Sequence, residues 1–222
     1  MPSARLFTDE TSLKVRALLD GAVSVFAEDG YSRASIDKIA RCAGVSSRTI
    51  YNRYGSKAGL FRAAIVASAQ HVADLQVGIV RDCLGAVGDQ SGLRHGLTAF
   101  ARAWDTPDPR TARHFALVRQ VRADVEHIPS DALAAWQEAG PRRVQAEIAA
   151  QIDRLAGLGL LVLPGTVDAW TAAAHLVALA VAGANTHRSR PGEDGEADAR
   201  RRAEAAVHTF LHGLGAPGPD PR

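Results

Sequence analysis

Cysteine is scarce in this chain, which has only Cys42 and Cys83 among its 222 residues. Two cysteines are too few for the disulfide framework that stabilises small secreted domains. No pair of Cys or His residues has the spacing of a structural zinc site. We therefore expect a protein of a reducing compartment that is stabilised by a hydrophobic core, for which the chain is long enough.

Long hydrophobic runs without charge are also missing. The first 16 residues carry five charged side chains, so we expect no signal peptide. The longest apolar stretch, residues 167–184, is rich in alanine and contains Asp168 and His175. It is too polar for a membrane span. These features predict a soluble, cytoplasmic protein that does not act at a membrane.

The net charge of +2 is small, but it is unevenly distributed. Residues 1–62 hold 10 Lys and Arg against 6 Asp and Glu, whereas residues 63–222 hold 16 against 18. All three lysines and all three tyrosines lie in the first part, and all three tryptophans lie in the second. This distribution predicts two chemically different parts, of which the first is suited to a polyanion.

The abundance of alanine and the scarcity of alternating apolar and polar residues predict an all-α fold. We expect the first helix to start near Thr11 or Ser12 and to stop at Gly30, with Gly30 left-handed. The further helices are expected over residues 36–42, 47–54, 57–84, 93–104, 110–126, 130–139, 141–155, 166–184 and 197–214. A mobile loop is expected at 189–195 and a disordered tail at 215–222.

Residues 35–57 have the pattern of a helix-turn-helix. Ala40 supplies the small residue that the crossing of two helices needs, and Gly44 permits the positive φ of the turn. Four apolar side chains form the small core between the helices: Ile36, Ile39, Val45 and Ile50. The second helix is left with an outward face that is polar and contains no acidic residue. Such a face is typical of a helix in the major groove of DNA.

Two segments, LLDGAVSVFAEDGY (18–31) and SIDKIARCAGVSSRTIYNRYGSK (35–57), together with Leu60 and Phe61, resemble the N-terminal DNA-binding domain of TetR-type (TetR/AcrR) transcriptional regulators. Residues 119–143 more loosely resemble the C-terminal region of an AefR-like subgroup. The resemblance implies an N-terminal three-helix helix-turn-helix domain, residues 1–56. It also implies a larger helical domain for ligand binding and dimerisation, residues 57–222.

The residues expected to contact DNA fall into two groups. Ser35 and Ser46 cap helices whose N-termini can receive a phosphate. Thr49, Tyr51 and Lys57 are similar to family positions that contact phosphates, although the Tyr51 ring could instead pack locally. Arg53 is a further candidate for a backbone contact.

Base reading is expected from Ser47, Arg48 and Asn52. Arg48 suits guanine, and Asn52 suits adenine. Many family members have lysine or glycine where this chain has Ser47 and Arg48, so its operator need not match that of a relative. Tyr54 and Phe61 are expected in the core.

The last two helices carry apolar stripes that fit a homodimer interface made of a four-helix bundle. The stripe residues are Trp170, Ala174, Val177, Val181, Val207, Phe210 and Leu214. The alternative is that both stripes pack within one chain.

An effector pocket is expected among the middle helices, where aromatic side chains occur with a few polar groups. The candidates are Phe100, Trp104, His114, Phe115, Val118, Arg122, Trp136 and His175, and each of them could instead serve core packing. The family resemblance predicts a repressor that binds a palindromic DNA operator as a homodimer and is released by a small apolar ligand.

Other functions have weaker support in the sequence. Glu204, His208 and His212 lie four residues apart on one helix, but no further ligand accompanies them, so we expect no metal site. No phosphate loop, nucleophile elbow or dinucleotide fingerprint is present, and we expect neither a cofactor nor an enzyme. Control by a protein partner, or by oxidation of Cys42 or Cys83, remains an alternative to a small ligand.

Overall fold

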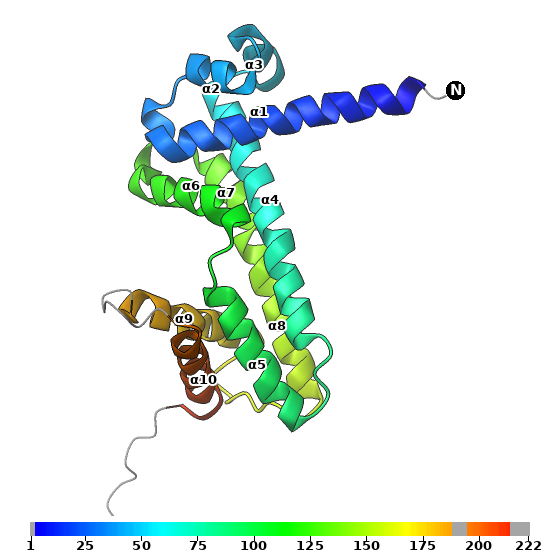
Figure 1. Ribbon diagram of the computed structural model, residues 1–222, viewed down its shortest axis with the longest axis vertical. Coiled ribbons are helices and arrows are strands. Elements are labelled where there is room, and N and C mark those ends of the chain that lie inside the picture. The colour runs from blue at the N-terminus through cyan, green and yellow to red at the C-terminus, as the bar shows by residue number, and fades with distance from the viewer. Residues whose placement is uncertain (1–2, 188–194, 214–222) are drawn as a thin grey trace, which may run out of the picture. The chain divides into compact units, whose positions relative to one another are not determined.

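The computed structural model describes residues 3–187 and 195–213, with side chains from residue 13 to 182 and from 195 to 213 (Figure 1). The described residues form helices and no strand, which confirms the all-α prediction. The α-helices are α1 (Ser3–Arg33), α2 (Ile36–Ala43), α3 (Ser47–Tyr54), α4 (Lys57–Leu84), α5 (Gln90–Asp105), α6 (Ala112–Ala123), α7 (Ser130–Ala139), α8 (Pro141–Gly157), α9 (Ala169–His187) and α10 (Glu196–His212). Two short 3₁₀ helices, η1 (Pro109–Thr111) and η2 (Val125–His127), flank α6.

The chain forms two compact units. Unit 1 combines the residues up to Asp74 with Asp108–Arg143, and unit 2 combines Leu75–Pro107 with the residues from Val144 onward. Helices α4 and α8 therefore contribute to both units. These units are defined by packing. The predicted boundary after residue 56 separates a DNA-binding domain from a regulatory domain, and it stays a prediction.

The core of unit 1 joins the helix-turn-helix to α6 and α7. Phe26 of α1 and Phe61 of α4 are fully buried, with ring centroids 4.9 Å apart in an edge-to-face arrangement. Leu117 of α6 and Ala132 of α7 are buried in the same cluster. Burial of this apolar surface, at about 25 cal/mol per Å², stabilises the unit as a whole. The helix-turn-helix thus shares its core with helices far along the chain.

Unit 2 is built from α5, α9, α10 and the adjoining parts of α4 and α8. Leu97 and Phe100 of α5, Ile148 and Ile152 of α8 and Val207 of α10 are buried in it. Arg154 donates hydrogen bonds to the carbonyls of Leu84 and Val87, at 2.6 and 2.9 Å, where α4 ends. The Leu84 carbonyl in the last turn of α4 also accepts the Val87 N–H at 3.2 Å, so the guanidinium adds a second donor where the helix has no further N–H to offer.

Helix ends differ from the prediction where capping was misjudged. Helix α1 begins at Ser3, earlier than expected. At the predicted stop, Gly30 (φ 78°, ψ 168°) leaves helical geometry with a positive φ, and the last turn to Arg33 follows across this kink. Helix α5 begins at Gln90 because the Asp89 side chain accepts a hydrogen bond from the N–H of Gly92 at 2.7 Å. The loop residues 189–194 and the tail 215–222 lie outside the described residues.

Other predicted helices differ in their bounds or in their caps. The helix expected over 110–126 divides into η1, α6 and η2. The sequence predicts Ser130 as the cap of α7, but the helix starts after Pro129, so Ser130 is its first residue. Helix α9 starts at Ala169, later than expected, and the turn before it includes Pro164 and Gly165.

Helix α4 is long and apolar enough to cross a membrane, judged by length and composition alone. Its side chains nevertheless serve the protein interior, because Leu60, Phe61, Ala64 and Ile65 are fully buried. Core helices of globular proteins pass the same test, so this helix gives no indication of a membrane protein.

Candidate nucleic-acid interface

The turn between α2 and α3 has the geometry that the sequence predicts. Gly44 adopts φ 65° and ψ 31°, the left-handed conformation that glycine tolerates best, and ends α2. The N–H of Val45 donates to the carbonyl of Ala40 at 3.0 Å. Ser35 and Ser46 are the N-caps of α2 and α3, and each accepts a backbone N–H three residues on at 3.1 Å. Both predicted caps are therefore confirmed as caps.

Helix α3 presents one face to the core and the other to solvent. Ile50 is fully buried, whereas the side chains of Arg48, Thr49, Tyr51, Asn52 and Arg53 are exposed. Tyr51 is 51% exposed, so its ring is not taken up by local packing. An exposed helix face with two guanidiniums, an amide and hydroxyls can donate hydrogen bonds to phosphates and to base edges.

Ser47 and Thr49 are already engaged within the motif. The Ser47 hydroxyl, which is half-buried, donates to the Asp37 carboxylate of α2 at 2.5 Å. The hydroxyls of Ser46 and Thr49 lie 2.8 Å apart. Among the predicted base readers, Arg48 and Asn52 remain exposed and have no side-chain hydrogen bond to any described residue. The geometry therefore favours Arg48 and Asn52 over Ser47 for base reading.

Lys57, the first residue of α4, is held by the end of α1. Its ammonium donates to the carbonyl of Ser32 at 2.9 Å and lies 5.0 Å from the centroid of the Tyr31 ring. Partial burial lowers the pKa of Lys57 from its ordinary value, while the nearby Asp124 charge opposes that shift. The predicted phosphate contact is thus placed at a junction of α1, α4 and the segment after α6.

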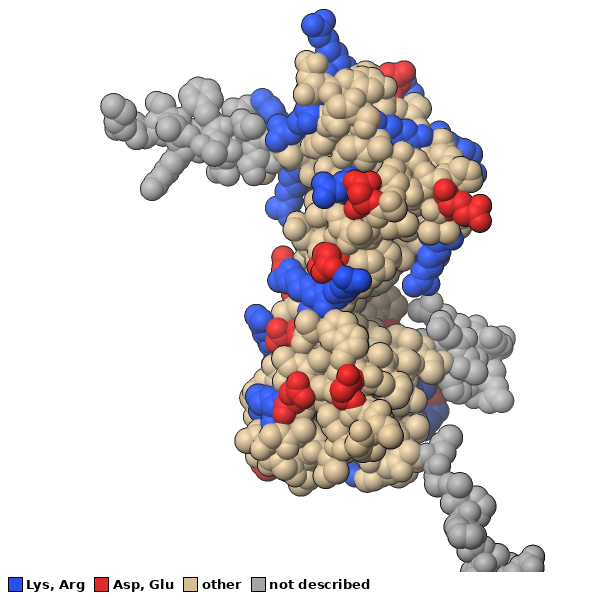
Figure 2. Space-filling view, turned by 180° about the vertical axis from the view of Figure 1, so that it is seen from behind, with Lys and Arg blue, Asp and Glu red and all other residues tan. Residues whose placement is uncertain are grey.

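Positive side chains surround the exposed face of α3. Figure 2 shows Lys and Arg projecting from the end of unit 1 that carries α2 and α3. Lys38 is an exception, because its ammonium is bound by Glu28 and by Asp29, at 3.0 and 2.8 Å. The cations free to meet a polyanion on α3 are therefore Arg48 and Arg53.

The predicted dimer residues separate into outward and inward positions. Trp170 is 47% exposed, Ala174 is exposed, and Val177, Val181 and Phe210 are half-buried. Val207 is buried inside unit 2, so for this residue the alternative of packing within one chain holds. Leu214 lies outside the described residues.

The predicted pocket residues lie in both units. His114, Phe115, Val118, Arg122 and Trp136 belong to unit 1, and Phe100, Trp104 and His175 belong to unit 2. Phe100 is fully buried against Trp104, with centroids 5.0 Å apart, and Val118 is buried, which agrees with core roles. Phe115 and Arg122 are exposed. His114 lines a cleft of unit 1, whereas His175 lines an apolar groove of unit 2.

The metal and redox alternatives gain no geometric support. The rings of His208 and His212 have centroids 4.9 Å apart, but no group of three potential metal ligands occurs among the residues described. Cys42 is exposed and Cys83 is half-buried. Burial and the Asp82 charge raise the pKa of the Cys83 thiol, which disfavours the reactive thiolate.

Sequence reasoning missed the contact between Ser32 and Asp124. The Asp124 carboxylate accepts the Ser32 N–H at 2.8 Å and the Ser32 hydroxyl at 2.7 Å. The two residues are 92 positions apart, and no local pattern links them. The exposed arginines of the unit 1 cleft, Arg16 and Arg113, were missed for the same reason.

Two family descriptions match the chain. Residues 18–64 match "Bacterial regulatory proteins, tetR family", and residues 97–215 match "AefR-like transcriptional repressor, C-terminal domain". The chain is 32% identical over 153 residues to MftR of Mycobacterium tuberculosis (strain ATCC 25618 / H37Rv), assigned to transcriptional regulation of mycofactocin biosynthesis. That match covers 68% of this chain and 70% of MftR. The DNA-binding transcriptional repressor TetR of Mycobacteroides abscessus is 47% identical over 49 residues, or 22% of this chain and 26% of that protein.

Solved structures agree in fold. A TetR-family transcriptional regulator from Mesorhizobium loti MAFF303099 superposes with a TM-score of 0.70 at 26% identity, covering 90% of this chain and 96% of that chain. FadR from Bacillus subtilis, solved in complex with stearoyl-CoA, superposes with a TM-score of 0.58 at 15% identity. That comparison covers 90% of this chain and 100% of that chain.

Proposed function

Because the chain belongs to the TetR family of bacterial transcriptional regulators, we propose that it is a cytoplasmic repressor that binds a palindromic operator as a homodimer and is released by a small ligand. The observation that carries this proposal is the division of α3, with Ile50 buried and five polar side chains exposed. Members of this family are DNA-binding regulators and not enzymes.

In this proposal residues 1–56 read the operator, and residues 57–222 dimerise and sense the ligand. Arg48 and Asn52 contact base edges in the major groove, with Ser47 beside them. Each good bidentate contact discriminates against a wrong base by about 1–3 kcal/mol. Tyr51, Arg53 and Lys57, with Thr49 and the N-termini that follow Ser35 and Ser46, contact phosphates and fix the register.

A single protomer that reads one half-site would bind DNA weakly, which favours a homodimer. Two recognition helices one DNA turn apart, about 34 Å, read both halves of a palindrome. The exposed Trp170 and Ala174 of α9 support a partner on that helix, with Val177, Val181 and Phe210 beside them. The pairing of α9 and α10 between two copies would form the proposed four-helix bundle.

Ligand release requires that the effector bind one conformer more tightly than the other, since only differential affinity shifts the equilibrium. FadR from Bacillus subtilis, which has this fold, was solved in complex with stearoyl-CoA, and this supports a site for a small molecule in the fold. Control by a protein partner or by thiol oxidation is the alternative. The exposed Cys42 on α2 is the thiol that oxidation could reach.

The proposal is tested by selecting bound sequences from a random DNA pool with the purified full chain. The expected result is an inverted repeat whose half-site centres lie one helical turn, about 10 base pairs, or a multiple of it apart. Recovery of unrelated sequences, or of single half-sites only, would count against an operator-binding dimer. The same binding assay after mild oxidation tests the thiol alternative, which unchanged affinity would exclude.

A further inference from the structure

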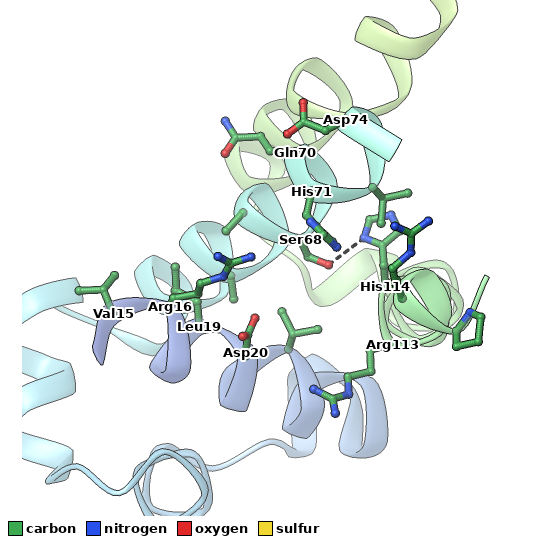
Figure 3. Close-up of a pocket in the computed structure, with 16 residues that line it drawn as sticks. Val15, Arg16, Leu19, Asp20, Ser68, Gln70, His71, Asp74, Arg113 and His114 are labelled. Atoms are coloured by element: carbon green, nitrogen blue, oxygen red, sulfur yellow. Dashed lines mark hydrogen bonds between the residues drawn. The ribbon is translucent and has the colours of Figure 1, made fainter. Parts of the chain in front are cut away.

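A cleft of about 710 Å³ lies within unit 1 between α1, α4 and α6 (Figure 3). Apolar side chains of two helices line part of it, among them Leu19 and Val23 from α1 and Ala64 and Val72 from α4. Polar and charged side chains line the remainder. A concave site of this size that offers both an apolar wall and charged side chains can bind a small molecule that has an apolar and a charged part.

The unpaired charge of the cleft is positive. Arg110 is held by Asp108 at 2.7 Å, and Asp74 is held by Arg143 at 2.6 Å, so these two lining residues are already neutralised. Arg16 of α1 and Arg113 of α6 have no ion pair with any residue in the described part of the chain, and neither has Asp20. Two free guanidiniums against one free carboxylate leave a site that matches a monoanion better than a dianion.

A buried histidine lies at the α6 side of this cleft. His114 is 7% exposed, and its Nδ1 lies 2.9 Å from the Ser68 hydroxyl of α4. Burial, with a contribution from His71, lowers the pKa of His114 to about 4, so the ring is neutral near pH 7. Figure 3 shows Ser68, His71 and His114 grouped together, with Arg16 and Asp20 projecting from α1 on the other side of the cleft.

We propose that this cleft binds an organic monoanion, a carboxylate carried on an apolar body, with Arg16 and Arg113 supplying the positive charge that attracts the carboxylate and the apolar side chains of α1 and α4 covering the body. Guanidinium groups bind carboxylates through charge-assisted hydrogen bonds, which are stronger than neutral ones. A phosphate dianion fits less well, because Asp20 would face a second negative charge.

Occupancy of this cleft acts on the helices that carry the DNA-binding motif. Helix α1 leads directly into α2, and the segment after α6 holds Ser32 through Asp124. An anion bound between Arg16 on α1 and Arg113 on α6 therefore reduces the repulsion of these charges and stabilises the packing of the two helices. The regulatory consequence, a change in operator affinity, rests on the proposed function, whereas binding of the anion does not.

The test is calorimetric titration of the DNA-free full chain with octanoate, 3-phenylpropionate and cyclohexanecarboxylate, each paired with its neutral amide. We expect at least one carboxylate to bind with a Kd below about 1 mM, and its amide to bind about tenfold more weakly. Arg16→Gln and Arg113→Gln should each weaken carboxylate binding about tenfold. Arg94→Gln, an exposed arginine of α5 in unit 2, is the matched control and should leave binding unchanged.

Three results would overturn the site: no carboxylate binding below about 1 mM, equal binding of acid and amide, or full binding by both arginine variants. The His114 ring resonances provide a second readout, because they should shift with carboxylate in the wild type and not in Arg113→Gln. Operator affinity is then measured with and without the carboxylate. Unchanged operator affinity in the presence of bound carboxylate would overturn the regulatory consequence alone. Failure to bind any operator without ligand would instead overturn the proposed function.

Discussion

The carboxylate of Asp124 accepts both the backbone N–H and the hydroxyl of Ser32, at 2.8 and 2.7 Å. The Ser32 carbonyl in turn accepts a hydrogen bond from the ammonium of Lys57 at 2.9 Å. The two hydrogen bonds from Ser32 hold the pKa of the Asp124 carboxyl below its ordinary value. A continuous chain of polar contacts thus joins the segment after α6 to the lysine that we propose as a phosphate contact.

The first prediction concerns this chain of contacts. Asp124→Ala should lower the free energy of unfolding by about 1 kcal/mol, because it removes the acceptor of two hydrogen bonds from the exposed Ser32, whose donors water can then solvate. It should also weaken operator binding, since Ser32 and Lys57 lose their fixed position. Chemical denaturation and fluorescence anisotropy with labelled DNA measure the two effects. Glu126→Ala is the control, since Glu126 is exposed two residues away and should change neither quantity. Equal behaviour of the two variants would contradict a positioning role for Asp124.

The second prediction concerns Lys57. Lys57→Ala should weaken binding to all DNA sequences alike and reduce the salt slope of log K by about 0.9 for each phosphate that the lysine no longer neutralises. Arg62→Ala, which removes a positive charge one turn further along α4, should leave the slope unchanged. The measurement is operator affinity over a series of salt concentrations. An unaltered slope in Lys57→Ala would mean that this lysine serves only to hold Ser32 and Tyr31.

The third prediction separates base reading from backbone contact on α3. Arg48→Ala should relax the base preference at one position of each half-site, at a cost of about 1–3 kcal/mol for the preferred base. Arg53→Ala should instead weaken binding uniformly across sequences. Both residues are exposed on the same helix, so each variant is the control for the other. Selection from a random pool with each variant gives the result, and a uniform loss in Arg48→Ala would refute its role in base reading.

The DNA-binding motif could be predicted from the sequence because its signals are local. Ser35 and Ser46 cap helices within three residues, and Gly44 and Gly55 end them with positive φ. These interactions depend on nearby residues and on intrinsic backbone preferences. The bounds of α3 and α4 were therefore correct to the residue.

Non-local packing could not be predicted in the same way. The hydrogen bonds between Ser32 and Asp124 depend on where α6 packs against α1, which no pattern in either helix specifies. Val207 lies in an apolar stripe that fits an interface between copies equally well, yet the structure buries it within its own unit. The unit 1 cleft combines Arg16 and Arg113 from helices that are nearly 100 residues apart.

The fourth prediction concerns the exposed face of α9. The full chain without DNA should sediment as a dimer, and Ala174→Arg should shift it toward monomer, because two buried unpaired charges would face each other across a two-fold axis. Ala86→Arg, in the exposed turn after α4, is the control and should remain dimeric. Analytical ultracentrifugation over a concentration series measures the change. A wild-type monomer, or a dimer that tolerates Ala174→Arg, would exclude this face as the interface.

The fifth prediction concerns the pH dependence of stability due to His114. Burial lowers its pKa from 6.5 to about 4 in the folded chain. Between these values the unfolded chain binds a proton that the folded chain does not, so the free energy of unfolding should fall as the pH decreases from 6.5 to about 4. Protonation of His114 should therefore reduce the free energy of unfolding by about 3 kcal/mol across this window, and it has no effect above pH 6.5, where the ring is neutral in both states. Asp20 on α1 and Arg110 and Arg113 also line this cleft, and the charge of His71 on α4 adds to the effect of burial on the pKa of His114.

His114→Gln tests the origin of this pH dependence, because glutamine can still bond to Ser68 but cannot be protonated. Its free energy of unfolding should therefore change less than that of the wild type over the same pH window. His95→Gln, an exposed histidine of α5, should retain the wild-type dependence. Urea denaturation at a series of pH values gives the comparison. If His114→Gln and the wild type lose the same free energy on acidification, the proton is taken up elsewhere.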